Sequence, residues 1–422
     1  MIIQLFKKNY RTLSVALPQL SLQKSLLALS MLFFAQFAIA NPIIPIQSAR
    51  AFSTVTPTAP NLGATSYILM DAASGHILAS KNADVKNPPA SLTKLMSLYV
   101  VSAALKSGQI HMDDPVLIST KAWKTEGSRM FVKAGDNVPL KDLLQGSMIA
   151  SGNDATVALA EYIAGSEDTF TAMMNQTAQR LGMINSHFMD STGLPNKDHY
   201  MSAHDLAILT RAYIDTFPED YHFYSEKWFS YHGIRQPNRN RLLWRFPDAD
   251  GLKTGHTNDA GYCLVGSAKK NGVRLISVIM GEPNDTARTE DSIRLLTYGF
   301  RFFETHKAYQ AATPVIEIRV WGGDKMNMPL GVTKDFYVTV PAGQYKRLQA
   351  SVHLNRTMKA PIVKGESYGN LNLTLNNEIV ASQQLVALDN SQPGGLIRKA
   401  TDSISYYIHR AFAQSNEKAN RG

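Results

Sequence analysis

The spacing of apolar and polar positions changes character several times along the chain. Residues 66–82, SYILMDAASGHILASKN, contain two strand-like runs on either side of Ala-Ser-Gly, which predicts a β-hairpin. From Ser91 to about Thr216, apolar residues recur at helical spacing, for example in NDATVALAEYIAG and in EDTFTAMMNQTAQRLG, whose last glycine suits a helix C-terminus. This stretch therefore predicts several packed helices.

Strand-like alternation returns after the helical stretch. In GYCLVGSAKKNGVRLISVIMG, Asn271-Gly272 joins two alternating runs, and this dipeptide is a strong signal for a tight hairpin. The segment TARTEDSIRLLTYGFRFFET then predicts a further helix. Strands at both ends of a helical middle predict one α/β domain over residues 64–310, in which helices cover an antiparallel sheet and part of the helical stretch forms an insert.

The pattern of apolar and polar residues changes again at about Ala311. TPVIEIRVWGG, DFYVTVPAG and RLQASVHLN are short alternating runs separated by Gly, Pro and Asn, and similar runs follow them. This pattern predicts a small all-β sandwich domain over residues 311–391. Residues 41–63 are rich in Pro, Ala, Thr and Ser and lack periodicity, and we interpret them as a flexible leader.

The first 40 residues have the pattern of an export signal. A basic stretch without acids precedes the apolar run SLLALSMLFFAQFAIA, which ends in the small-residue pattern Ala38-Ile39-Ala40. Residues 1–40 are therefore predicted to be a signal peptide that is cut after Ala40. The alternative, a membrane anchor that is kept, fits the short apolar core less well.

Residues 392–422 predict an amphipathic helix and tail. After Gln392-Pro-Gly-Gly395 breaks the chain, the segment LIRKATDSISYYIHRAFAQ places apolar residues at helical spacing and most of its charged residues on other faces. A basic helix with an aromatic-bearing apolar stripe is typical of an anchor that lies in the plane of a membrane surface. The alternative is a surface helix that docks on the sandwich, since such helices are also amphipathic.

The net charge indicates which partners the chain can bind, and the single cysteine limits its covalent chemistry. Removing Lys7, Lys8, Arg11 and Lys24 with the signal lowers the formal charge from +9 to +5. This mild excess favours an anionic membrane surface over nucleic acid. Cys263 is the only cysteine, so the chain forms no intramolecular disulfide, and its strand-like surroundings predict a buried hydrophobe instead of a nucleophile.

The segment PASLTKLMSLYVVSAAL contains the first candidate for chemistry. Ser91 stands at the predicted start of a helix, and Lys94 is the only charged residue between Ser91 and Leu105. Residues three apart share a helix face, so the amine can reach the hydroxyl. Burial among apolar residues lowers the pKa of a lysine, which makes it a base that can take the serine proton.

Two further short patterns follow in the same order along the chain. Ser151-Gly152-Asn153 opens a helical run and is expected on a loop, and Lys253-Thr254-Gly255 lies at the entry to the second strand pair. S-x-x-K, S-D-N and K-T-G together are the signature of class A β-lactamases and penicillin-binding proteins. The order of serine helix, loop and strand distinguishes these copies from other matches to the same short strings.

With these residues the chain resembles the low-molecular-mass penicillin-binding proteins, specifically the serine D-alanyl-D-alanine carboxypeptidases of the periplasmic, membrane-anchored kind. The segments SGNDATVALAEYIAGSEDTF, HFMDSTGLP, RNRLLW and DGLKTGHTNDAGY also resemble that family. The resemblance implies the α/β transpeptidase fold of that family with a C-terminal β-sandwich domain and a terminal amphipathic helix. It also implies removal of the terminal D-Ala from peptidoglycan stem pentapeptides, covalent inhibition by β-lactams and a role in cell-wall cross-linking and cell shape.

The resemblance also implies residue roles. Ser91 is the nucleophile, Lys94 is its base, and Ser151 relays a proton to the leaving D-Ala, with Lys253 as a nearby fixed charge. Further residues bind substrate: Asn153 contacts its amide, the backbone N–H groups of Ser91 and His256 form an oxyanion hole, and Thr254 of Lys253-Thr254-Gly255 holds the terminal carboxylate with Arg239 or Arg288. Arg241 is an alternative to Arg239 for the carboxylate contact, because both arginines lie in the segment NRNR.

Two departures qualify the resemblance. The middle motif has glycine where the β-lactamase pattern has aspartate, and residues 183–205 contain no glutamate that could activate a deacylating water. Slow release of penicillin and weak or absent β-lactamase action are therefore predicted. Asp190 could substitute, but an aspartate in a polar loop is more often a turn or cap residue. The histidines lack metal-binding spacing, so neither a metal nor another cofactor is expected.

The resulting hypothesis is a carboxypeptidase in the periplasm, held peripherally on the outer face of the inner membrane. Its expected partners are stem peptides, β-lactams and, through the C-terminal helix, an anionic membrane surface. A D,D-endopeptidase or β-lactamase could use the same site. A penicillin-binding sensor that does not turn over is a different class, and the sequence contains neither a partner domain nor a second long apolar segment to suggest it.

Overall fold

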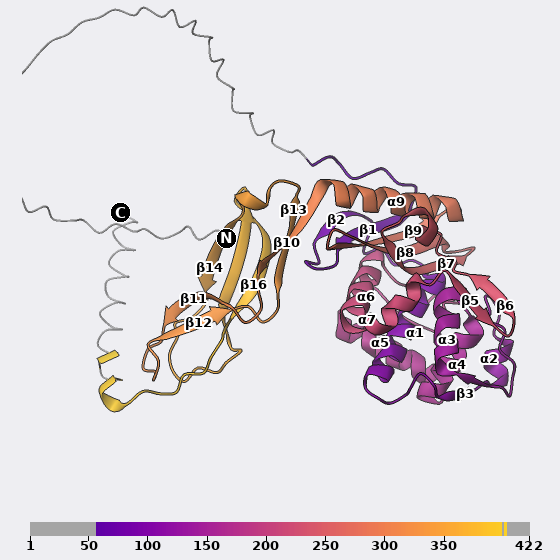
Figure 1. The fold of residues 1–422 in the computed structure, drawn as a ribbon, viewed down its shortest axis with the longest axis horizontal. Coiled ribbons are helices and arrows are strands. Elements are labelled where there is room, and N and C mark those ends of the chain that lie inside the picture. Colours follow the sequence, from indigo (N-terminus) through magenta and orange to yellow (C-terminus); the bar gives the residue numbers. More distant parts are fainter. Residues whose placement is uncertain (1–55, 399–400, 403–422) are drawn as a thin grey trace, which may run out of the picture. The chain divides into compact units, whose positions relative to one another are not determined.

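The computed structural model describes residues 56–398 and 401–402. The predicted signal peptide (1–40), most of the predicted leader (41–63) and residues 403–422 of the predicted terminal helix lie outside the described residues. No helix in the described ranges is long and apolar enough to cross a membrane. The first part of the described chain forms an α/β domain and the second part is rich in strands (Figure 1).

A five-stranded antiparallel sheet is the centre of the α/β domain. Its strand order is β2-β1-β9-β8-β7, so the two hairpins predicted from sequence meet through β1 and β9. Asn271 and Gly272 both have positive φ at the β8–β9 turn, as that tight hairpin requires. The strands are β1 (Ser66–Asp71), β2 (Ile77–Lys81), β7 (Ala249–Thr257), β8 (Gly261–Lys270) and β9 (Val273–Glu282).

Alternating side chains bury both faces of this sheet. On β1, Ile68 and Met70 join the large core beneath the helical part, whereas Tyr67 and Leu69 join a second core on the opposite face. Helix α9 (Asp285–Phe302) covers the second face together with the short helix α8 (Leu242–Arg245), and the other helices lie on the first (Figure 1). The strand period of two thus explains why the β1 run reads as almost continuously apolar.

The helical part surrounds α1 (Lys94–Lys106), which is buried on nearly all sides. The other helices of this part are α2 (Thr120–Lys124), α3 (Leu140–Gln145), α4 (Asn153–Ala164), α5 (Glu167–Leu181), α6 (Ala203–Thr216) and α7 (Pro218–Tyr221). Two small antiparallel sheets of two strands accompany them, formed by β3 (Pro115–Leu117) with β4 (Asn137–Pro139) and by β5 (Trp228–Tyr231) with β6 (Ile234–Pro237). Side-chain caps fix several helix starts, as at α5, where Ser166 accepts from the Thr169 N–H at 3.1 Å.

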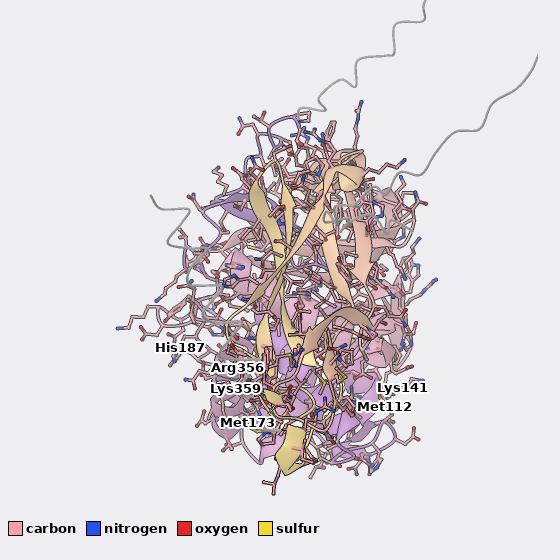
Figure 2. All side chains as sticks on the ribbon, turned by 90° about the vertical axis from the view of Figure 1, so that its left-hand side faces the viewer. Met112, Lys141, Met173, His187, Arg356 and Lys359 are labelled. Carbon is pink, nitrogen blue, oxygen red and sulfur yellow. The ribbon has the colours of Figure 1, made fainter. Side chains whose placement is uncertain are left out.

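The strand-rich part begins at β10 (Phe303–Tyr309), which pairs with β13 (Phe336–Pro341). A second, five-stranded sheet has the order β11-β12-β16-β15-β14, and its strands are β11 (Pro314–Arg319), β12 (Asn327–Gly331), β14 (Gln349–Leu354), β15 (Ser367–Leu375) and β16 (Glu378–Ala387). Leucine, valine and methionine side chains from both sheets form one core. On the surface, Arg356, which is labelled in Figure 2, pairs with Glu366 at 2.8 Å and covers the Tyr368 ring.

Residues just before β1 differ from the flexible leader predicted over 41–63. The Tyr298 hydroxyl of α9 donates to the Pro57 carbonyl at 2.9 Å, Leu62 is buried, and the Gly63 N–H donates to Asp291 Oδ2 at 3.0 Å. Residues 57–63 therefore pack along α9. The prediction failed there because a segment without periodicity can still be held by single apolar and polar contacts.

The chain continues as helix at residues 396–398 and 401–402. Asp402 accepts from Arg319 at 2.9 Å and from the Gly322 N–H at 3.0 Å, which ties this segment to the strand-rich part. Leu396 and Ile397 remain 86% and 84% exposed. In the described part of the predicted terminal helix, Asp402 thus binds the strand-rich part, whereas the apolar side chains of Leu396 and Ile397 are exposed.

Candidate active site

The three predicted motifs meet at the edge of the central sheet. Edge strand β7 contains Lys253-Thr254-Gly255 and lies against the 3₁₀ turn Ala90–Thr93, which contains Ser91. A Cβ at Gly255 would lie 2.8 Å from the Pro89 carbonyl oxygen, so only glycine permits this approach. The loop at Ser151 completes the site from the helical part.

The Ser91–Lys94 pair has the geometry of a nucleophile and its base. Lys94 begins α1 directly after the 3₁₀ turn, and its Nζ donates to Ser91 Oγ at 2.9 Å. It also donates to the Thr192 carbonyl at 3.0 Å. The expected reach over three residues is therefore present, although the first turn of the predicted helix is a 3₁₀ turn.

Burial changes the acidity of Lys94. The side chain is fully buried, and desolvation lowers its pKa to about 7, while Asp190 and Asp154 act in the opposite direction and Arg239 adds to the lowering. An ammonium has to give up its hydration to sit in this core, so the neutral amine is favoured. Near neutral pH a large fraction of Lys94 can accept a proton.

The turn that supplies the Thr192 carbonyl is held by Asp190. Asp190 Oδ1 accepts from the backbone N–H groups of Thr192 and Gly193 at 2.6 and 2.7 Å, and Oδ2 lies 3.4 Å from His199 Nδ1. Despite desolvation, the His199 and backbone contacts lower the Asp190 pKa to about 2. Asp190 is thus a turn residue, the interpretation favoured from the sequence, and its Oδ1 is occupied by the turn.

Ser151 lies opposite, at the end of a π-helical turn, Gly146–Ala150. It has φ of 61°, an uncommon left-handed conformation for serine, and is almost fully buried. Lys253 Nζ donates to Ser151 Oγ at 2.8 Å and to the Thr254 carbonyl at 3.1 Å. A second serine–lysine pair therefore faces the first.

Lys253, which the resemblance implies as a fixed charge, lies in surroundings that disfavour its ammonium form. Desolvation, followed by the nearby Lys94 ammonium and two arginines, lowers its pKa well below the usual range. Each ammonium of the Lys94–Lys253 pair makes the other more costly, so their protons are coupled.

Asn153, the first residue of α4, is held by its backbone and its amide nitrogen. Its N–H donates to the Ser128 carbonyl, and Nδ2 donates to the Glu126 carbonyl, both at 2.6 Å. Its buried Oδ1 has no partner among the described residues. A buried acceptor without a partner is costly, so this oxygen is available for a ligand N–H.

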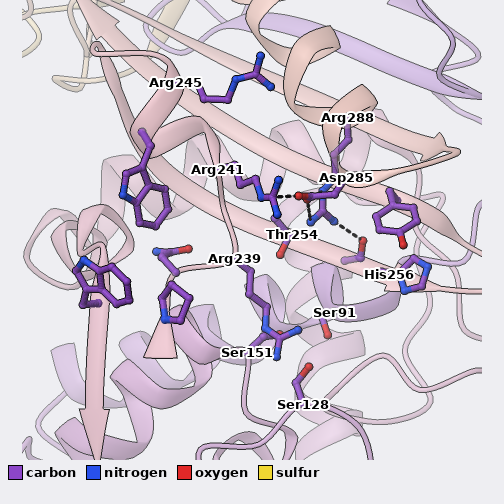
Figure 3. A pocket seen from close by; sticks show the side chains of 16 residues that line it. Ser91, Ser128, Ser151, Arg239, Arg241, Arg245, Thr254, His256, Asp285 and Arg288 are labelled. Carbon is purple, nitrogen blue, oxygen red and sulfur yellow. Dashed lines mark hydrogen bonds and ion pairs between the residues drawn. The ribbon is translucent and has the colours of Figure 1, made fainter. Parts of the chain in front are cut away.

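A cavity of about 720 Å³ joins the predicted residues (Figure 3). Its lining includes Ser91, Ser151, Thr254, Gly255, His256, Arg239, Arg241 and Arg288, together with Ser128, Trp228, Pro237, Asn238, Trp244, Arg245, Tyr262 and Asp285. Lys94, Asn153 and Lys253 stand behind this surface, each through the contacts given above. The site thus brings together all of the predicted positions, including the rivals Arg239 and Arg241.

The three arginines differ in their contacts. Arg288 is buried and uses Nη1 on the Gly255 and Cys263 carbonyls, while Nε donates to Asp285 at 2.9 Å. Arg241 Nε pairs with the other oxygen of Asp285 at 2.7 Å. Arg239 donates only through Nε, to the Ala150 carbonyl at 3.1 Å, among the described residues.

Sequence reasoning missed the residues that depend on remote backbone. The contact of the Thr192 carbonyl with Lys94 and the place of Trp228 and Trp244 in the cavity lining were not assigned from the sequence, although HFMDSTGLP contains Thr192 and RNRLLW contains Trp244. Cys263 is buried, and burial raises its thiol pKa to about 11, which fits the predicted structural role. Within residues 56–398 and 401–402, no cluster of three or more His, Cys, Asp or Glu side chains could hold a metal.

Known proteins share this chain's sequence and architecture. A D-alanyl-D-alanine carboxypeptidase family model matches residues 53–284, and a model of the C-terminal domain of penicillin-binding protein 5 matches residues 303–392. D-alanyl-D-alanine carboxypeptidase DacC of Escherichia coli (strain K12) is 43% identical over 85% of this chain and 91% of its own length.

Solved structures agree with these sequence matches. Penicillin-binding protein 5 from Haemophilus influenzae has a TM-score of 0.77 and 42% identity over 80% of this chain and 99% of that chain. Penicillin-binding protein D2 from Listeria monocytogenes, solved in its ampicillin-bound form, has a TM-score of 0.54 and 28% identity over 58% of this chain and 100% of that chain.

Proposed function

The chain belongs to the D-alanyl-D-alanine carboxypeptidase family and is a serine-type hydrolase of peptidoglycan peptides, and we propose that Ser91 is its nucleophile and Lys94 its general base. The observation that carries this assignment is the 2.9 Å contact between Lys94 Nζ and Ser91 Oγ, made by a buried amine with a pKa of about 7. Such an amine can take the hydroxyl proton as the oxygen attacks.

Acylation follows from this pair. Ser91 Oγ attacks the carbonyl carbon of the penultimate D-Ala, and Lys94 takes its proton. The Ser91 and His256 backbone N–H groups stabilise the oxyanion that develops, because donors aimed at forming charge lower the barrier. Ser151, paired with Lys253, passes a proton to the leaving nitrogen, D-Ala departs, and water then hydrolyses the ester.

Arg239 and Thr254 are the proposed binding groups for the C-terminal carboxylate. Arg239 donates to protein only through Nε among the described residues, so its two terminal nitrogens remain for a bidentate contact. Arg288 is committed to two carbonyls and Asp285, which fits support of β7 better than direct recognition. Asn153 Oδ1 would accept the amide N–H of the acyl part.

Slow deacylation after β-lactam attack is also proposed. The two carboxylate oxygens of Asp190 contact the turn and His199, so Asp190 does not replace the missing glutamate of class A β-lactamases. Penicillin should therefore leave a long-lived ester on Ser91, with weak β-lactamase action.

Labelling and product analysis test these roles together. A fluorescent penicillin should attach to the wild-type protein, and mass spectrometry should find D-Ala and a tetrapeptide after incubation with a stem pentapeptide. Ser91→Ala should abolish both, whereas Ser97→Ala, a buried serine on the same helix, should retain labelling if the variant folds. Labelling of a folded Ser91→Ala protein would refute the nucleophile. Labelling without product would identify a sensor.

The domain limits and the location of the protein are further proposals. Residues 1–40 act as an export signal, residues 64–310 form the catalytic domain, residues 311–391 belong to the β-rich domain, and residues 392–422 bind an anionic membrane surface from the periplasm. Exposed Leu396 and Ile397 support this last point, while the Asp402–Arg319 contact supports the docking alternative.

Truncation distinguishes the two possibilities for the terminal segment. Ending the chain after Gly395 should preserve hydrolysis of soluble peptides and release the protein from membranes. Retention of the truncated protein on anionic vesicles would contradict membrane binding by this segment.

A further inference from the structure

A buried imidazole lies next to the 3₁₀ turn Ala90–Thr93, here called the catalytic turn. The His199 side chain is only 1% exposed, and its Nε2 lies 2.9 Å from Thr93 Oγ1, while its Nδ1 lies 3.4 Å from Asp190 Oδ2. Thr93 is the last residue of the catalytic turn and directly precedes Lys94. His199 therefore bridges the catalytic turn and the turn that begins at Asp190.

The charge on Asp190 decides which ring nitrogen of His199 has the proton. Despite desolvation, contacts with His199 and with backbone N–H groups lower the pKa of Asp190 to about 2, so the carboxylate is ionised at neutral pH. An ionised carboxylate favours a proton on the nitrogen that faces it, which is Nδ1. The Met189 N–H, 3.4 Å from the same nitrogen, competes with it but is uncharged. Nε2 is then an acceptor, and the Thr93 hydroxyl donates to it.

Backbone pairs hold the residues that follow His199 in the chain. Tyr200 exchanges two hydrogen bonds with His187, at 2.8 and 3.0 Å. Met201 exchanges two with Asn87, at 2.9 and 3.0 Å. A side chain on such a supported backbone, enclosed on nearly all sides, is a fixed point from which the two turns can be held.

The turn that begins at Asp190 has further anchors on helix α5. Glu167 Oε1 accepts from the Ser191 N–H at 3.1 Å and from Ser191 Oγ at 2.6 Å. Asp190 Oδ1 closes the turn itself through the backbone contacts described above. A change at His199 should therefore leave this turn folded and loosen only its approach to the catalytic turn.

The two turns together hold the proposed base. Lys94 Nζ donates to Ser91 Oγ of the catalytic turn at 2.9 Å and to the Thr192 carbonyl of the other turn at 3.0 Å. A relative shift of the turns therefore changes the approach of the amine to the Ser91 hydroxyl. Proton transfer requires a heavy-atom distance of about 2.6–3.2 Å, so even a small shift slows the reaction.

We propose that His199 is a positioning residue for acylation. Its two contacts set the distance between the turns, and this distance aligns Lys94 with Ser91. Neither His199 nor Thr93 lines the cavity around Ser91, so the effect is indirect. No bond to His199 forms or breaks in the reaction. The inference rests on the proposed roles of Ser91 and Lys94.

Stopped-flow acylation by a fluorescent penicillin separates alignment from binding. The first-order rate constant at saturating penicillin reports alignment, and the concentration for half-saturation reports binding. His199→Leu replaces the imidazole with an apolar side chain of similar volume. It should lower the rate constant about tenfold and leave the half-saturating concentration within about twofold of wild type. The fraction of protein labelled at completion should remain that of the wild type.

Two companion variants identify the hydrogen bond as the cause. His199→Gln keeps an amide that can reach Thr93, so it should retain a rate constant within about threefold of wild type. Thr93→Val removes the hydroxyl at the other end of the contact and should reproduce the loss seen in His199→Leu. Because both changes break one contact, the double variant should lose no more than either single variant.

His204 provides a matched control. It forms another histidine–carboxylate contact in the same domain, with Nδ1 2.9 Å from Asp84 Oδ1, and neither residue lines the cavity around Ser91. His204→Leu should leave the rate constant and the half-saturating concentration unchanged. An equal loss in this variant would make the effect non-specific and overturn the proposal.

Three other results would overturn it. A wild-type rate constant in Thr93→Val would show that the contact does not align the base, and this measurement decides even if His199→Leu fails to fold. A loss confined to the half-saturating concentration would assign His199 to ligand binding. Losses that multiply in the double variant would show that the two residues act separately. Labelling of a folded Ser91→Ala protein would instead refute the proposed function itself.

Discussion

The pH dependence of acylation tests the role of Lys94 most directly. Only the neutral amine can take the Ser91 proton, and burial lowers its pKa to about 7. As pH rises through 7 the reactive fraction therefore increases. The Asp190 carboxylate opposes this lowering, so Asp190→Asn should lower the Lys94 pKa further and move the rise in rate to lower pH.

The size of the wild-type effect follows from the proton equilibrium. With a pKa of about 7, roughly a tenth of Lys94 is neutral at pH 6 and roughly nine tenths at pH 8. The second-order rate of acylation should therefore rise about tenfold between these values and level off above them. Coupling to Lys253 can broaden the rise, since both amines share the same buried region.

Stopped-flow measurement with a fluorescent penicillin isolates this step, because it ends before ester hydrolysis. His256, the one histidine among the described residues that line the cavity, provides a control, and His256→Asn should not shift the midpoint pH of the acylation rate. A flat acylation rate from pH 6 to pH 8 would refute the argument. The argument would also be refuted if the midpoint pH of the acylation rate shifted in His256→Asn and stayed the same in Asp190→Asn.

Two other predictions concern the framework around the site. Glu282 is buried beside Asp291, and desolvation and that neighbour raise its pKa to about 7, so folding takes up a proton and stability falls as pH rises from about 4.5 to 7. Glu282→Gln should raise the free energy of unfolding at pH 8 by about 1–2 kcal/mol, and the increase at pH 4 should be much smaller. Urea titrations that give the same increase at both pH values would contradict this. Gly193 has φ of +89°, and a Cβ there would lie 1.9 Å from the Ala90 carbonyl oxygen. Gly193→Ala should therefore displace the turn and reduce the rate of penicillin acylation at least about tenfold, while the circular dichroism spectrum stays native-like. Full acylation by this variant would show that the turn does not position Ser91.

Local patterns predicted the elements of the site better than its assembly. Ser91 and Lys94 were found because a helix fixes the reach of residues three apart. Asn271-Gly272 located its hairpin because few residues accept the backbone of that turn. Both signals are contained in a few neighbouring residues, which is why the sequence alone was sufficient.

Contacts between distant segments were beyond such reasoning. The Thr192 carbonyl reaches Lys94 across a long stretch of chain, and a carbonyl has no residue type to reveal it. The uneven engagement of Arg239 and Arg288 likewise depends on where β7 and α9 meet. Residues 57–63 read as leader because their attachment comes from α9, far along the chain.

The division of the site among three remote segments has a consequence for folding. Turn 90–93, the loop at Ser151 and edge strand β7 come together only when the sheet has closed on the helical part. Contacts of such long sequence separation carry a loop-closure cost that slows their formation. A partly folded chain with native helices would lack a reactive serine, so covalent penicillin capture during refolding would count completed molecules and ignore intermediates.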